Sequence, residues 1–223
     1  MRGWQMLKAV LFDFDDTLGD REEYAYGLYR DVLKEYTDKL TASEAEAMIQ
    51  RCLIWDQFGN TNKRYVQGKL KEYFDIDLGY DLDDYWENNL WRYAALFPDA
   101  MDTLQELKKT YKIGVITNGN SYGQNKKLQV TGVDKVADLC IVSGDTPYRK
   151  PQPEIFRMAA EGLGVECSEC AFVGDAYFND MLGAARAGMY GIWYWPHGKR
   201  LHVTGEPQIS SLSELPELLK TIM

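Results

Sequence analysis

The chain has 223 residues, of which 45% are hydrophobic and 26% are charged. This length and balance are ordinary for a globular protein and fit one large domain, or a domain with a smaller insertion. The net charge of −9 argues against a nucleic-acid polymer as the main partner. A small phosphorylated substrate remains compatible, because a local site can be positive within a negative protein.

The cysteines and the absence of a targeting segment bear on the compartment. Cys167 and Cys170 form a lone C-x-x-C pair, and the chain has only two histidines, His197 and His202. A zinc site would want a second pair or nearby histidines, so we expect reduced, structural cysteines. The apolar run at residues 9–12 is too short for a signal peptide, and no run approaches transmembrane length. We therefore expect a cytoplasmic protein with no membrane partner.

The first expected strand runs into an acidic cluster. Residues 8–18 read KAVLFDFDDTL, and the four apolar residues predict a strand buried on both faces. Asp13, Asp15 and Asp16 follow at its carboxyl end, where open α/β sheets bind ligands. Close carboxylates repel each other, and the usual compensation is a cation, which for hard oxygen ligands is Mg²⁺ or Ca²⁺. For this cluster alone, a solvated turn or a helix cap is an equal alternative.

Residues 20–96 show helical spacing of apolar residues and no strand pattern. One helix is expected after Asp20, and the capping box of Thr41 and Glu44 begins a second. Two more are expected, near residues 63–74 and from residue 81. The sequence therefore predicts an all-helical segment here.

From residue 97 onward, helices alternate with strands. Strands are expected over residues 112–118, 138–142, 170–175 and 190–194, each separated from the next by a helical pattern. This alternation predicts an α/β fold with a doubly wound parallel sheet and right-handed crossovers. The expected domains are a Rossmann-like core of residues 1–19 plus 97–223 and a helical cap of residues 20–96. The cap is expected to cover the acidic cluster as a lid.

Several strand ends carry polar groups. Thr117 and Asn118 end the second strand, Lys150 follows the third, and Asp175 and Asp180 follow the fourth. Singly, each has an ordinary explanation as a helix cap or an exposed lysine. Together with the first acidic pair they describe phosphoryl transfer, in which a carboxylate-bound cation and a lysine neutralise phosphate charge. One aspartate can attack while a second handles the proton.

Four segments, D-F-D-D-T-L, V-I-T-N-G, R-K-P-Q-P-E-I-F and V-G-D-A-Y-F-N-D, occur in this order. They resemble the four motifs of the haloacid dehalogenase-like (HAD) superfamily, a family of hydrolases with a Rossmann-like core. The helical insertion is similar to the C1-type cap of that family by position and helical character only.

The resemblance implies a role for each matching residue. It implies that Asp13 is the nucleophile and Asp15 the general acid and base. It implies that Thr117 and the backbone of Asn118 bind phosphate. Lys150 is implied to pair with the nucleophile and the phosphate.

The resemblance also implies a Mg²⁺ site. Asp13, the backbone carbonyl of Asp15, and Asp175 would hold the ion, and Asp180 would support them. The second aspartate favours a phosphatase, since the otherwise similar dehalogenase branch lacks it. One departure is the segment of residues 144–149, which replaces a commoner small and apolar approach to the lysine.

We therefore expect a Mg²⁺-dependent phosphomonoester hydrolase that acts on a small phosphorylated metabolite, a nucleotide or a sugar phosphate, through an aspartyl-phosphate. A phosphomutase of the same family is the alternative, and a phospho-aspartate signalling domain is a weaker one. The sequence leaves the substrate and the oligomeric state open.

Overall fold

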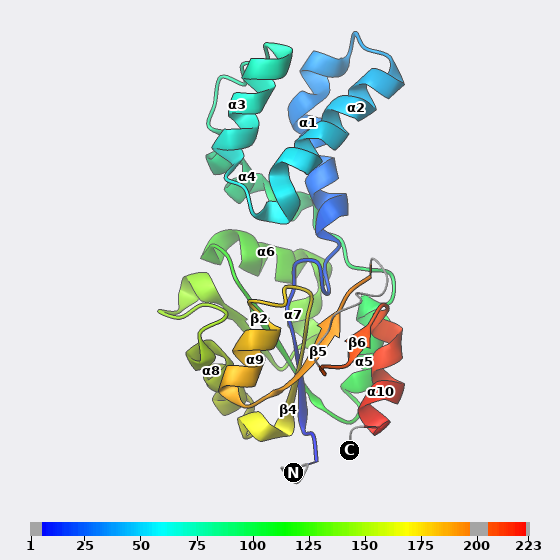
Figure 1. The fold of residues 1–223 in the computed structure, drawn as a ribbon, viewed down its shortest axis with the longest axis vertical. Coiled ribbons are helices and arrows are strands. Elements are labelled where there is room, and N and C mark those ends of the chain that lie inside the picture. Colours follow the sequence, from blue (N-terminus) through cyan, green and yellow to red (C-terminus); the bar gives the residue numbers. More distant parts are fainter. Residues whose placement is uncertain (1–5, 197–204, 222–223) are drawn as a thin grey trace. The chain divides into compact units, whose positions relative to one another are not determined.

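The computed structural model describes residues 6–196 and 205–221. His197 and His202 lie outside these residues. The chain divides into two compact units, one of residues 1–19 and 96–223, called the core unit below, and one of residues 20–95, called the helical unit (Figure 1).

The core unit is built on a six-stranded sheet with the order β3-β2-β1-β4-β5-β6, in which all neighbours are parallel. The strands are β1 (Ala9–Phe12), β2 (Lys112–Thr117), β3 (Leu139–Val142), β4 (Cys170–Gly174), β5 (Tyr190–Tyr194) and β6 (Gln208–Ile209). The predicted doubly wound parallel sheet is confirmed. The sequence did not predict β6, because a two-residue edge strand is too short to carry a hydrophobic pattern.

Helices cover both faces of this sheet. They are α5 (Ala100–Leu107), α6 (Ser121–Thr131), α7 (Val133–Val136), α8 (Pro153–Leu163), α9 (Met181–Ala187) and α10 (Leu215–Thr221). Successive side chains of β1 point to opposite faces of the sheet, as strand geometry requires. Val10 and Phe12 join one hydrophobic cluster with α5 and α10, whereas Ala9 and Leu11 join another with α8 and α9 (Figure 1). Burial on both faces explains why β1 reads as a continuous apolar run.

The helical unit consists of α1 (Arg21–Thr37), α2 (Ala42–Asp56), α3 (Lys63–Phe74) and α4 (Leu82–Asn89), with a 3₁₀ turn at Leu90–Tyr93. Asp20 caps α1, and Thr41 and Glu44 form the expected capping box of α2. The unit has a hydrophobic cluster of its own, which includes Leu28 and Trp86. None of the helices in the described part of the chain is both long and apolar enough to cross a membrane.

A buried ion-pair cluster ties three helices of this unit together. Asp56, at the end of α2, accepts a hydrogen bond from Arg21 of α1 at 2.8 Å and pairs with Lys63 of α3. Tyr29 donates to the same carboxylate at 3.4 Å. Burial raises the pKa of Asp56, but the two cations outweigh it, so the pKa lies below its ordinary value. The charged groups are therefore buried as a mutually compensated set.

Two glycines of the helical unit give opposite predictions for the same substitution. At Gly27 of α1 a Cβ would lie 2.8 Å from Cδ1 of Tyr93, whose hydroxyl is held by Asp31, whereas at Gly68 of α3 no atom lies within 4 Å. We expect Gly27→Ala to destabilise the protein by about 1–3 kcal/mol through overpacking. We expect Gly68→Ala to stabilise it by about 0.5–1 kcal/mol through the lower entropy of the unfolded chain. Urea unfolding followed by circular dichroism checks this pair, and shifts of the same sign would contradict it.

Candidate active site

The chain turns sharply after β1 and leaves Asp13 at the carboxyl end of the central strand. The Asp13 N–H donates to the carbonyl of Val173 at 2.9 Å, which continues the pairing of β1 with β4. The carbonyl of Phe14 then accepts from the N–H groups of Leu18 and Gly19 at 2.9 and 2.7 Å. The turn therefore holds the Asp13 side chain over the strand end, where the Phe14 N–H donates to its Oδ1 at 2.7 Å.

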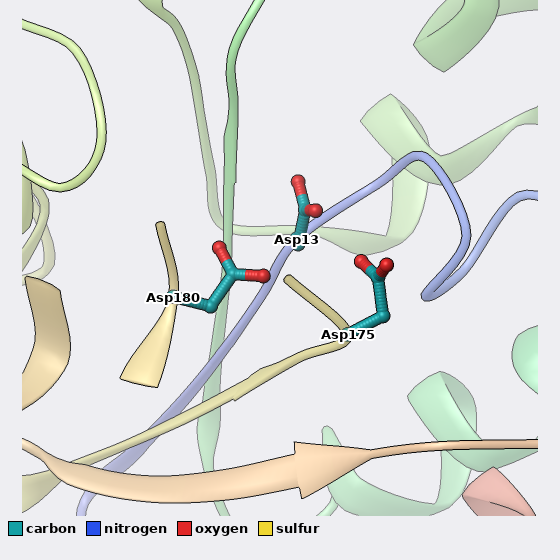
Figure 2. A group of neighbouring side chains, drawn as sticks. All are labelled: Asp13, Asp175 and Asp180. Atoms are coloured by element: carbon teal, nitrogen blue, oxygen red, sulfur yellow. The ribbon is translucent and has the colours of Figure 1, made fainter. Parts of the chain in front are cut away.

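Three carboxylates from distant parts of the sequence meet at this point. Oxygens of Asp13, Asp175 and Asp180 all lie within 4.8 Å of one another (Figure 2). Asp175 directly follows β4 and Asp180 directly precedes α9, so the adjacency of β1 and β4 brings them to Asp13. The structure thus brings together three of the acids that the sequence singled out.

Burial makes this acidic cluster unfavourable when it is fully ionised. Burial raises the pKa of Asp13 to about 7, although Lys150 opposes the shift. Burial also raises the pKa of Asp175 well above its ordinary range, and the charges of Asp13 and Asp180 add to that shift. A divalent cation would compensate the charge, and an all-oxygen donor set suits a hard ion. The residues present therefore fit a divalent metal.

Asp180 is completely buried behind the other two acids. Its Oδ2 accepts from the N–H of Ala176 at 2.9 Å, and its Oδ1 lies 2.7 Å from Nζ of Lys150. A Cβ on Gly174 would lie 2.4 Å from Oδ2 of Asp180. The glycine of the V-G-D segment is therefore required for the close approach of this carboxylate.

Lys150 lies between two carboxylates and is almost fully buried. Its Nζ is 2.6 Å from Oδ1 of Asp13 as well as 2.7 Å from Asp180. Burial lowers the pKa of the lysine, but the two carboxylates outweigh it and leave the pKa above its ordinary value. The amide side chain of Asn118 fixes this position, because it accepts from the Lys150 N–H at 2.9 Å and donates to the Lys150 carbonyl at 3.0 Å.

Thr117 ends β2 in a buried position. Its Oγ1 accepts a hydrogen bond from Nε2 of Gln124 at 2.9 Å, and the same nitrogen lies 2.8 Å from the carbonyl of Asn118. The two residues expected to bind phosphate thus lie at the carboxyl end of the strand next to β1. Arg149, in the segment that departs from the family pattern, is exposed.

Of the four aspartates expected in the site, Asp15 is the one whose side chain does not join the acidic cluster. Its carboxylate instead accepts from Lys127, with Nζ 2.8 and 3.0 Å from the two oxygens, and from Gln124 at 2.8 Å. Sequence reasoning missed both partners. They are three residues apart on α6 and so share a helix face, but a lysine at that spacing is ordinarily solvent-exposed.

Thr17 is a further residue that sequence reasoning missed. It is completely buried, its Oγ1 accepts from the Asp175 N–H at 3.1 Å, and it lies 3.3 Å from Oδ1 of the same residue. Nε1 of Trp193 donates to the Asp175 carbonyl at 2.7 Å. Asp175 is therefore positioned both by the turn that follows β1, through Thr17, and by β5, through Trp193. The threonine of the D-F-D-D-T-L segment was the available signal.

Comparison with known proteins identifies the class to which this fold and site belong. The profile of the haloacid dehalogenase-like hydrolases matches residues 7–188. The chain belongs to this family of hydrolases, and the resemblance seen in the four motifs is confirmed.

Particular relatives within the family are phosphatases. Glyceraldehyde 3-phosphate phosphatase of Methanothermobacter thermautotrophicus is 32% identical over 196 residues, which are 84% of this chain and 85% of the relative. N-acylneuraminate-9-phosphatase of Mus musculus is 29% identical over an alignment of 249 positions, which covers 99% of this chain and 96% of the relative. A crystal structure of YfnB from Bacillus subtilis bound to magnesium is 25% identical, with a TM-score of 0.76 over 96% of this chain and 99% of that one. The expected enzyme class, a phosphatase, is confirmed.

The raised pKa of Asp13 predicts that metal binding releases protons. At pH 6 a carboxyl with a pKa of about 7 is mostly protonated, and a metal binds the ionised form. We expect Mg²⁺ binding to release more protons at pH 6 than at pH 8.5, by about one proton per site, and the affinity to weaken as the pH falls below 7. Isothermal titration calorimetry in buffers of different ionisation enthalpy measures this number. A pH-independent release would contradict the prediction.

Proposed function

We propose that this hydrolase is a Mg²⁺-dependent phosphatase, which cleaves phosphate monoesters of small metabolites through an aspartyl-phosphate on Asp13. The observation that carries the proposal is the position of the Asp13 carboxylate. It lies at the end of the central strand, 2.6 Å from Nζ of Lys150, in the acidic cluster with Asp175 and Asp180. A nucleophilic carboxylate beside a fixed cation suits attack on phosphorus.

In the first half of the proposed reaction, an Asp13 oxygen forms a bond to phosphorus and the bond from phosphorus to the leaving oxygen breaks. Asp15 donates its proton to that oxygen, so the alcohol leaves neutral. Lys150 favours the ionised form of Asp13, against the effect of burial, and fixes its orientation through the contact with Oδ1. Thr117 and the backbone of Asn118 are proposed to bind the phosphoryl oxygens.

In the second half, water attacks the phosphorus of the aspartyl-phosphate and gives its proton to Asp15. The bond between phosphorus and the Asp13 oxygen breaks, which releases inorganic phosphate and restores both carboxyl groups. Mg²⁺, when bound, supplies positive charge that compensates the phosphoryl group and the acids. Asp13, the Asp15 carbonyl and Asp175 are proposed to hold it, with Asp180 behind them.

The proposed substrate class is a small sugar-type phosphate or a nucleotide. Support comes from the two relatives, which are named for glyceraldehyde 3-phosphate and N-acylneuraminate 9-phosphate. Selection of the leaving group by the helical unit, and its function as a C1-type cap, remain predictions. The strand order β3-β2-β1-β4-β5-β6 differs from the 2-1-3-4-5 order of receiver domains and so disfavours the signalling alternative.

The proposal predicts metal-dependent turnover that requires Asp13. With p-nitrophenyl phosphate and Mg²⁺, we expect Asp13→Asn to lower kcat by at least about 10³-fold, because the nucleophile is lost while the side-chain shape is kept. Release of p-nitrophenolate and of inorganic phosphate measures the effect, with and without a chelator. Retained turnover in Asp13→Asn would contradict the proposal.

The products distinguish the alternatives. A phosphatase releases one inorganic phosphate for each substrate consumed, whereas a phosphomutase returns the phosphoryl group to a substrate-derived alcohol. A signalling domain would be phosphorylated on Asp13 without turnover. A panel of sugar phosphates and nucleotides then identifies the substrate class.

A further inference from the structure

The side chain of Asp15 is held by two residues of α6 rather than by the acidic cluster. Nζ of Lys127 lies 2.8 Å from its Oδ1 and 3.0 Å from its Oδ2, and Nε2 of Gln124 lies 2.8 Å from Oδ2. Both carboxylate oxygens therefore accept hydrogen bonds, and the plane of the carboxylate is fixed by donors from one helix. A charge-assisted contact of this length is among the stronger hydrogen bonds in proteins.

The two donors are themselves fixed. Lys127 and Gln124 are only 6% and 4% exposed, so neither side chain has the rotational freedom of a surface residue. Nε2 of Gln124 also contacts Oγ1 of Thr117 and the carbonyl of Asn118, at 2.9 and 2.8 Å. One amide nitrogen thus links Asp15 to the end of β2.

Local structure explains why α6 presents these residues together. Asn120 caps the helix, and its Oδ1 accepts from the Gly123 N–H at 2.7 Å. Gln124 and Lys127 follow three residues apart, so they occupy adjacent positions on one helix face. Side chains of a helix lean toward its N-terminus, and here that is the end joined to β2 through residues 118–120.

We propose that Lys127 is a positioning residue for the acid and base Asp15, and that Gln124 assists it. Lys127 acts through its contact with the Asp15 carboxylate. Its effect is to keep the Asp15 carboxylate at one place and orientation, so that a proton can pass to the leaving oxygen and later come from water. The inference rests on the proposed phosphatase reaction. Small displacements of a proton donor are costly, since misplacement by 1 Å can lower a rate by about 10²-fold.

A purely structural role is the competing explanation. A buried lysine needs an anionic partner, and Asp15 would then serve only to stabilise α6. The two explanations differ in whether the loss of activity on mutation depends on the leaving group of the substrate. Loss of a structural ion pair lowers turnover of every substrate alike. Loss of a positioning contact affects the step that needs the proton, and spares leaving groups that depart as stable anions.

The experiment compares Lys127→Met with two substrates. Phenyl phosphate has a leaving oxygen that needs a proton, and p-nitrophenyl phosphate has one that departs readily without it. We expect kcat/KM to fall at least about 10-fold more for phenyl phosphate than for p-nitrophenyl phosphate. Slow hydrolysis of the intermediate should also give a burst of p-nitrophenolate before the steady state. Lys127→Arg should restore part of the loss.

Matched variants separate positioning from folding. Lys126→Met changes the preceding residue, whose Nζ lies over the ring of Tyr122, 6.0 Å from its centroid. This variant should leave kcat/KM for both substrates unchanged. In an Asp15→Asn background, Lys127→Met should cause no further loss of activity, because a residue that acts through Asp15 has no effect without it. Circular dichroism and thermal unfolding establish that each variant is folded. Lys127→Gln, which keeps a donor for Asp15, replaces the methionine variant if that variant does not fold.

The possible results separate the positioning role of Lys127 from the proposed phosphatase reaction. Equal losses for the two substrates, or a further loss in the Asp15→Asn background, would overturn the positioning role while leaving the phosphatase proposal intact. Absence of turnover by the wild type on all phosphate monoesters would overturn the proposed function and this inference with it.

Discussion

The site depends on one constraint, the crowding of three carboxylates, two of them buried and one half-buried, beside a single lysine. Asp13, Asp175 and Asp180 have oxygens within 4.8 Å of one another, and Lys150 lies 2.6–2.7 Å from two of them. One cation cannot neutralise three carboxylates that are so close and so little exposed to water, so the ionised cluster requires further positive charge or a proton. The raised pKa values of Asp13 and Asp175 express the same imbalance. A site that lacks positive charge in this way is suited to bind a divalent cation. The bound cation would then also compensate the charge of a phosphoryl group in the site.

The topology of the sheet makes that crowding possible. Phe12 of β1 pairs with Val173 of β4, so Asp13 and Asp175 leave the sheet at nearly the same level on neighbouring strands. The supporting contacts then remove freedom from each member. Thr17 and Trp193 hold Asp175, and the side chain of Asn118 holds the backbone of Lys150. Each of these supporting side chains lies on a strand or just after one, so the site residues are held by fixed parts of the fold, as preorganised catalytic sites require.

The sequence predicted the parts of the site that lie at strand ends. Apolar runs identified five of the strands, and the acids that follow β1 and β4 were expected at one edge because parallel strands end there. Their direct contact depends on the adjacency of β1 and β4, which the sequence did not predict. Nor could the sequence predict what lies behind those acids. Lysine is usually exposed, so neither the burial of Lys150 nor that of Lys127 can be read from spacing. Thr17 and Gln124 act through contacts with residues far away in the sequence, and helical or strand periodicity carries no information on such partners.

Two of the aspartates that follow β1, Asp13 and Asp15, are paired with different lysines and lie in different environments. Asp13 shares Lys150 with Asp180 in a buried, acidic environment, whereas Asp15 is paired with Lys127, which contacts both of its oxygens, and accepts from the amide of Gln124 at Oδ2. The side chain of Asp15 is 23% exposed, more than twice that of Asp13. Enzymes assign different roles to paired carboxyl groups by giving them different environments. A nucleophile has to be ionised and aimed at phosphorus, while a proton carrier has to exchange protons with a leaving oxygen and with water. In the proposed reaction, the separate lysine partners would allow two aspartates, only two residues apart, to meet these two requirements.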